Sequence, residues 1–146
     1  MKVVFVCTGN TCRSPMAEYL MKDYCKKKNL KIYAESRGLA CSNGKPISEN
    51  SLIALSNVGI DAKEHVSSSF TLKDLFDADL VVTMTQSHKD ALIYHFNAGE
   101  NVKTFDEITG LGNVVDPYGL SIYEYEKCRE QIEKGIPIIV DYLTKK

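Results

Sequence analysis

The chain has 146 residues, of which 44% are hydrophobic and 25% are charged, a composition that is ordinary for a globular domain with its own core. Its 18 basic and 19 acidic residues leave a net charge of −1, so no basic excess favours nucleic acid or a membrane surface as partner. The apolar runs are too short to span a bilayer, and the five cysteines lack zinc-type spacing, which predicts reduced thiols and no metal site.

A strand, a short polar loop and a helix are expected in succession at the start of the chain. Residues 3–6, VVFV, form a short apolar run, which predicts a buried strand. Residues 7–13, CTGNTCR, form the loop, and Ser14 and Pro15 are typical of a helix start, with Ser14 as N-cap. Backbone N–H groups and the positive end of the helix dipole converge in such a loop, which predicts an anion site.

Cys7 and Arg13, at the two ends of this loop, suit an attack on a phosphoryl group. A free thiol is mostly protonated at neutral pH, and converging N–H donors, a helix N-terminus and a nearby arginine lower its pKa. The hydroxyl of Ser14 could also donate to the sulfur. The planar guanidinium of Arg13 matches two phosphate oxygens, and the same donors would stabilise the equatorial oxygens of the transition state. The alternative is a turn that holds a buried structural cysteine.

Strands and helices are predicted to alternate along the rest of the chain. Apolar residues at helical spacing predict helices at 15–28, 47–58 and 86–96, and a mostly helical segment at 121–146. Short apolar or alternating runs predict strands at 31–36, 78–84 and 102–105. Polar stretches at 38–46 and 67–71 are expected to be connectors, and Thr71 with Asp74 resembles a capping box that begins a short helix. Gly135 and Pro137 interrupt the last helix, so we expect a kink or a break there.

The alternation predicts an α/β fold with right-handed crossovers and a doubly wound parallel sheet. Ligands of such sheets bind beyond the carboxyl ends of the strands, which is where Cys7 lies. No repeat or linker is visible, so a single domain over residues 1–146 is expected. Met1 leads directly into a strand without a hydrophobic leader, which predicts a cytoplasmic protein.

Two motifs resemble those of the low-molecular-weight protein tyrosine phosphatase family. CTGNTCRSPMAE, residues 7–18, resembles its phosphate loop, and DPYG, residues 116–119, resembles its general-acid loop at the expected distance late in the chain. The resemblance implies a four-stranded parallel sheet flanked by helices. It also implies a protein phosphatase that acts on phosphorylated protein substrates and uses no metal and no cofactor.

The resemblance implies a covalent mechanism with three catalytic residues, Cys7, Arg13 and Asp116. Cys7 would attack phosphorus and form a phosphocysteine, while Asp116 would protonate the leaving atom and then act as base toward water. Without the Cys7 loop, Asp116 would be interpreted as a turn residue before Pro117. The residues expected to bind the substrate are Thr8, Gly9, Asn10, Thr11, Cys12, Ser14 and Tyr118.

Some of these residues have expected roles that follow from their chemistry. Asn10 is expected to shape the loop, because Asn tolerates left-handed backbone, and Gly9 to let the backbone approach the anion. Tyr118 would form a wall of the substrate slot, which suits a phenol ring and a guanidinium plane equally. The three histidines are far apart in the sequence, and none is given a role.

Thr11 bears on the substrate. The family's phosphotyrosine enzymes often carry a bulkier aliphatic residue at the matching position, whereas its protein-arginine phosphatase branch resembles this chain in GNTCRS and in DP-aromatic-G. A threonine hydroxyl could position water or a guanidinium nitrogen, and Asp116 could pair with a guanidinium. We therefore favour phosphoarginine, with phosphotyrosine as the alternative if Thr11 only packs in the loop.

Cys12 lies on the same loop as Cys7, and in this family a neighbouring cysteine can trap an oxidised nucleophile as a reversible disulfide. The alternative is a small buried residue beneath the loop. Other functions are less well supported. An arsenate reductase would need a further cysteine between Cys41 and Cys128, a silent phospho-residue binder would need no nucleophile, and a pure redox sensor would show oxidation without useful turnover. The sequence does not indicate an oligomeric state.

Overall fold

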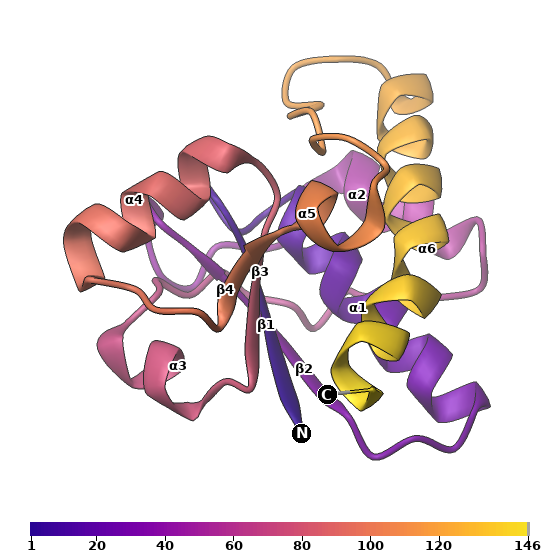
Figure 1. The fold of residues 1–146 in the computed structure, drawn as a ribbon. Helices are drawn as coiled ribbons and strands as arrows, with labels where there is room; N and C mark the ends of the chain where they lie inside the picture. The colour runs from indigo at the N-terminus through magenta and orange to yellow at the C-terminus, as the bar shows by residue number, and fades with distance from the viewer. Residues whose placement is uncertain (146) are drawn as a thin grey trace.

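Four parallel strands form one sheet in the order β2-β1-β3-β4 (Figure 1). The structure is a computed structural model that describes residues 1–145. The strands are β1 (Lys2–Cys7), β2 (Tyr33–Gly38), β3 (Leu80–Thr83) and β4 (Val102–Thr104). The chain passes from β1 to one neighbour, β2, and then across β1 to β3 on its other side. The carboxyl end of β1 is therefore the switch point of the sheet, where α/β folds bind their ligands.

Helices cover both faces of this sheet. They are α1 (Arg13–Lys27), α2 (Glu49–Ser56), α3 (Leu72–Asp77), α4 (Gln86–Phe96), α5 (Phe105–Thr109) and α6 (Ile122–Thr144). Figure 1 shows α1, α2 and α6 together on one side and α3 and α4 on the other. Alternate side chains of β1 enter two separate cores: Phe5 and Cys7 pack on the side of α1 and α6, and Val4 and Val6 on the side of α3 and α4.

Several predicted elements are confirmed with small changes at their ends. The helix predicted at 86–96 has those bounds, and the capping box of Thr71 and Asp74 begins α3. The second strand begins and ends two residues later than predicted. The helix predicted at 47–58 is shorter, because Ser48 caps it and its side chain accepts from the N–H of Ser51.

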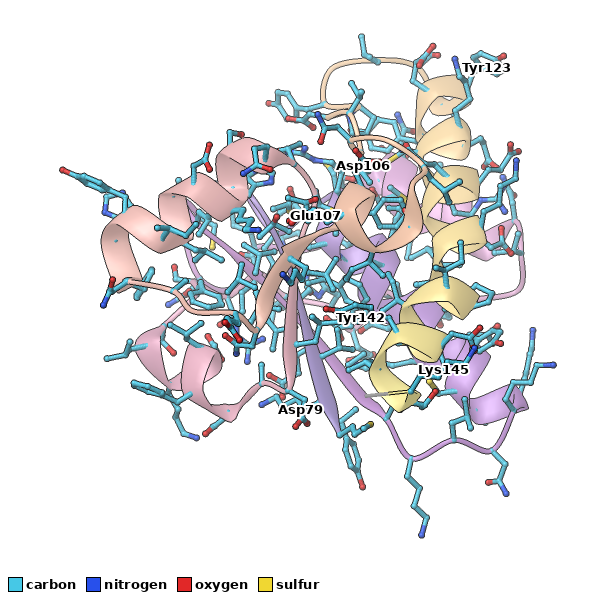
Figure 2. The ribbon with its side chains drawn as sticks, viewed as in Figure 1. Asp79, Asp106, Glu107, Tyr123, Tyr142 and Lys145 are labelled. Carbon is cyan, nitrogen blue, oxygen red and sulfur yellow. The ribbon has the colours of Figure 1, made fainter. Side chains whose placement is uncertain are left out.

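Two predictions are corrected at the start of α1 and after β4. Helix α1 begins at Arg13, and its N-cap is Cys12, whose side chain does not hydrogen-bond to the first turn of the helix, so Ser14 is not the cap. The short helix α5 was not predicted. Its capping box is formed by Thr104 and Glu107, and the Glu107 side chain (Figure 2) also accepts from Lys89 of α4 at 2.8 Å.

The expected break in the last helix does not occur. Helix α6 runs from Ile122 to Thr144 as one helix with Pro137 inside it. Pro137 lies on the exposed face, where the carbonyl that loses its N–H partner, that of Glu133, can be hydrated. Gly135 is buried, and a Cβ there would fall on the ring of Phe105, so this glycine lets α5 pack closely against α6. No helix within residues 1–145 is long and apolar enough to cross a membrane.

Candidate active site

A cavity of about 220 Å³ lies at the carboxyl end of β1. It is bounded by the loop between β1 and α1 and by the segment that precedes α6. Eight side chains or backbone segments line it, namely Cys7, Thr8, Gly9, Thr11, Cys12, Arg13, Asp116 and Tyr118. Of the residues predicted for the site, Asn10 and Ser14 are the two that do not line the cavity, because both are fully buried behind it.

Ser14 is the hydrogen-bonding partner of the Cys7 sulfur. Its Oγ lies 2.9 Å from Cys7 Sγ and accepts a hydrogen bond from the Asn10 side-chain amide, also at 2.9 Å. Asn10 supplies the hydrogen for that bond, so the single hydroxyl proton of Ser14 can be directed either to the sulfur or to the carbonyl of Arg37, which lies 3.4 Å from Ser14 Oγ. The expectation that Ser14 donates to the sulfur therefore fits the geometry, although Ser14 is not the helix cap.

The pKa of the Cys7 thiol is raised on balance. Burial of the sulfur is the largest cause. The Ser14 hydroxyl, the backbone N–H groups of Ser14 and Asn10, and the charge of Arg13 all act in the opposite direction. The sequence indicated these lowering groups but not the burial that outweighs them, so the pKa of Cys7 is raised where a lowered one was predicted.

Asn10 shapes the loop as expected. Its backbone is left-handed, with φ of 57°, its side-chain oxygen accepts from the N–H of Ser68 at 2.9 Å, and its carbonyl lies 2.8 Å from His65 Nε2. The left-handed residue of the loop is thus Asn10 and not Gly9. Gly38 of β2 permits a close approach of that strand to the loop, because a Cβ there would lie 2.8 Å from the Thr8 carbonyl oxygen.

Arg13 links the loop to the segment that carries Asp116. The buried guanidinium donates to the carbonyl of Val114 at 3.0 Å, and its other terminal nitrogen lies 3.7 Å from Asp116 Oδ2. Asp116 is about half exposed, and its Oδ1 accepts from the N–H of Tyr118, which forms a local turn. Asp116, which is about a hundred positions away in the sequence, therefore meets Cys7 and Arg13 at one cavity.

The far end of the loop is held by α2 and α6. The Ser48 N–H donates to the carbonyl of Thr11 at 2.8 Å, and the Ser51 hydroxyl donates to the carbonyl of Cys12 at 3.3 Å. Cys12 Sγ donates to Ser48 Oγ at 3.5 Å and lies 3.6 Å from the hydroxyl of Tyr125. Cys12 is nearly buried but still borders the cavity, and all five cysteines are free thiols.

His88 is a residue that sequence reasoning missed. It lies near the start of α4, is only 6% exposed, and its Nε2 is 2.9 Å from Thr8 Oγ1 in the phosphate loop. The pKa of His88 is lowered to about 4, first by burial and then by the charge of Arg13, while Asp116 opposes the change. The adjacency of β1 and β3 creates this contact, and no local motif marks it. Within residues 1–145 no group of three His, Cys, Asp or Glu side chains could hold a metal ion.

Comparison with known proteins decides the family. The family model described as "Low molecular weight phosphotyrosine protein phosphatase" matches residues 2–146 of the chain. The chain belongs to this family. A protein-arginine-phosphatase of Bacillus subtilis (strain 168) is 38% identical over 148 residues, covering 99% of this chain and 98% of that protein. A low molecular weight protein-tyrosine-phosphatase PtpB of Staphylococcus haemolyticus is 38% identical over 133 residues, covering 90% and 92%.

Solved structures of the low molecular weight phosphatase family share the whole fold. A mutant of the YwlE arginine phosphatase with a phosphorylated active-site serine superposes with a TM-score of 0.94 at 36% identity, covering 100% of this chain and 97% of that chain. The protein-arginine-phosphatase of Bacillus subtilis and the PtpB of Staphylococcus haemolyticus have the same sequence identity to this chain, 38%. Similarity therefore supports the family but does not favour either substrate.

Proposed function

We propose that this chain is a cysteine-dependent protein phosphatase that hydrolyses phosphoarginine in proteins through a phosphocysteine intermediate. The observation that carries the proposal is the convergence of Cys7, Arg13 and Asp116 on one cavity, with the Ser14 hydroxyl 2.9 Å from the sulfur. A phospho-residue binder would need the anion site but neither a nucleophile nor an acid. The similarity to named protein-arginine and protein-tyrosine phosphatases supports the same chemistry.

In the first step, the Cys7 thiolate attacks phosphorus, the S–P bond forms, and the P–N bond to the arginine side chain breaks. The leaving nitrogen keeps the electron pair of the P–N bond and takes the proton of Asp116, so arginine leaves with its guanidinium restored and Asp116 becomes a carboxylate. In the second step, Asp116 takes a proton from water, the water oxygen attacks phosphorus, and the S–P bond breaks to release phosphate and the thiolate. Arg13 and the loop N–H groups hold the phosphoryl oxygens throughout, and the guanidinium has further N–H donors for them besides the one that bonds to the carbonyl of Val114.

Phosphoarginine is favoured by the lining of the cavity. Thr11 is half buried and lines the cavity together with Asp116 and Tyr118. A threonine narrows the slot less than an isoleucine would and offers a hydroxyl to a guanidinium nitrogen or to water. Once it has given up its proton, the Asp116 carboxylate can pair with the guanidinium of the leaving arginine, and the ring of Tyr118, which is 78% exposed, can stack on the guanidinium plane.

The test is kcat/KM on a phosphoarginine peptide and on a matched phosphotyrosine peptide. Wild type should prefer phosphoarginine, and Thr11→Ile should lower the ratio of the two values at least about tenfold. Thr144→Ile, the same substitution at an exposed position of α6, is the matched control and should leave the ratio unchanged. Cys7→Ser should be inactive on both peptides.

A tyrosine preference in the wild type would refute the arginine proposal and assign Thr11 to loop packing. The alternative function, a low molecular weight protein tyrosine phosphatase, is supported by the similarity to PtpB. Residual turnover in Cys7→Ser would refute the nucleophile itself.

A further inference from the structure

His88 and Thr8 connect α4 to the phosphate loop, and the mechanism above leaves His88 without a role. His88 Nε2 lies 2.9 Å from Thr8 Oγ1, and His88 Nδ1 lies 3.1 Å from Thr85 Oγ1. Thr85 is the N-cap of α4, and its hydroxyl oxygen also accepts from the backbone N–H of His88. The cap of the helix therefore fixes the imidazole, which is buried directly behind an exposed residue of the cavity wall.

The imidazole of His88 is neutral at physiological pH, since burial lowers its pKa to about 4. A neutral imidazole carries one N–H and one lone pair, so one ring nitrogen donates while the other accepts. Both tautomers fit the distances, because the Thr85 hydroxyl can donate to Nδ1 or accept from it. The tautomer is therefore decided on the other side of the ring, at Thr8.

The two tautomers give Thr8 opposite polarity toward the cavity. With the proton on Nε2, His88 donates to Thr8 Oγ1, and the hydroxyl proton of Thr8 is free to point into the cavity. With the proton on Nδ1, Thr8 must donate to Nε2 and can offer only lone pairs to the cavity. Phosphoryl oxygens are acceptors, so a bound phosphoryl group favours the first arrangement and is repelled by the second.

We propose that His88, in its Nε2-protonated tautomer, is a positioning residue that turns the hydroxyl of Thr8 into a donor for a phosphoryl oxygen. The inference rests on the proposed function in one respect, that the cavity holds a phosphoryl group. It adds one side-chain donor to those supplied by Arg13 and the backbone. It also explains why a polar ring is buried between a helix cap and the loop.

A double-mutant cycle on the affinity for inorganic phosphate tests this arrangement. Thr8→Val removes the hydroxyl at nearly constant shape, and His88→Leu removes the ring nitrogen that orients it. Each single variant should weaken phosphate binding about tenfold, which is the loss expected for one hydrogen bond to a charged group. The double variant should be no weaker than Thr8→Val alone, because both substitutions remove the same donor.

Two further variants separate positioning from a structural effect. His88→Gln, whose amide can donate toward Thr8, should recover part of the affinity that His88→Leu loses. His95→Leu, the same substitution at an exposed position of the same helix, should bind phosphate like wild type. If His88→Leu weakens phosphate binding as strongly in the Thr8→Val background as in wild type, His88 acts on the fold and the inference is wrong.

The tautomer can be observed directly by ¹⁵N NMR of the imidazole nitrogens at neutral pH. Phosphate-saturated protein should show the proton of His88 on Nε2, and a proton on Nδ1 would overturn the inference. Arg13→Ala distinguishes this failure from a failure of the proposed function. If phosphate binding is undiminished in Arg13→Ala, the cavity is not the phosphoryl site and both proposals fall. If Arg13→Ala abolishes binding and the cycle is additive, only the role of His88 falls.

Discussion

Replacing Ser14 by alanine should reduce the reactivity of the Cys7 sulfur. The Ser14 hydroxyl lies 2.9 Å from the sulfur and 3.4 Å from the carbonyl of Arg37, and a thiolate, being charged, is the stronger acceptor of its one proton. The substitution withdraws a donor from the thiolate without changing the charge of the site. Since burial already raises the pKa of Cys7, the loss of this donor should raise that pKa further.

The size of the effect follows from the type of hydrogen bond. A hydrogen bond to a charged group contributes about 1.5–3 kcal/mol, which corresponds to about 10- to 100-fold less thiolate at neutral pH. A thiolate of higher pKa is intrinsically more nucleophilic, with a Brønsted slope of about 0.4–0.5, and this recovers about half of the loss on a logarithmic scale. We therefore expect kcat/KM to fall by about 3- to 15-fold in Ser14→Ala.

The direct assay is the pH dependence of alkylation by iodoacetamide, followed by mass spectrometry of the peptide that carries Cys7. Its inflection should move to higher pH in Ser14→Ala. Ser51→Ala is the matched control, because Ser51 is also buried and its hydroxyl bonds to the carbonyl of Cys12 without contacting the sulfur. An unmoved inflection in Ser14→Ala, or an equal movement in Ser51→Ala, would refute the reasoning.

Two more predictions concern the helix contact and the second loop cysteine. Gly135→Ala should lower the free energy of unfolding by about 1–3 kcal/mol in a denaturant titration, because its Cβ falls on the ring of Phe105. Gly99→Ala, which meets open space, should change it by less than about 0.5 kcal/mol, and an equal stability of the two variants would contradict the packing argument. Cys12→Ser should lose the recovery of activity that wild type shows when reductant follows peroxide, because no disulfide to Cys7 can then form. Equal recovery in both proteins would remove Cys12 from any redox role.

Local signals in the sequence were sufficient for most of the fold. The apolar run before Cys7 predicted β1, and the spacing of apolar residues over 86–96 predicted α4 with the observed bounds. Helix α5 was missed although its signal was present, since Thr104 and Glu107 have the spacing of a capping box. Of the kink or break predicted at Pro137, the break does not occur, because Pro137 is on the exposed face, where the carbonyl left without an N–H partner can bond to water.

The site was predictable where one loop encodes it and not where the sheet assembles it. Cys7 and Arg13 share a seven-residue segment, so their meeting follows from local sequence. His88 contacts Thr8, which is 80 positions away in the sequence, only because β3 pairs with β1. The positions of the histidines in the sequence do not predict that strand order.

The same limit applies to the pKa of Cys7, because the groups that lower it are close in sequence, whereas its burial comes from the core packed around β1. Because the fold buries the Cys7 sulfur and this burial raises its pKa, the reactivity of Cys7 must depend strongly on the hydrogen-bond donors around the sulfur. This is why Ser14, and Thr8 through His88, should matter more to this enzyme than their positions in the motif suggest.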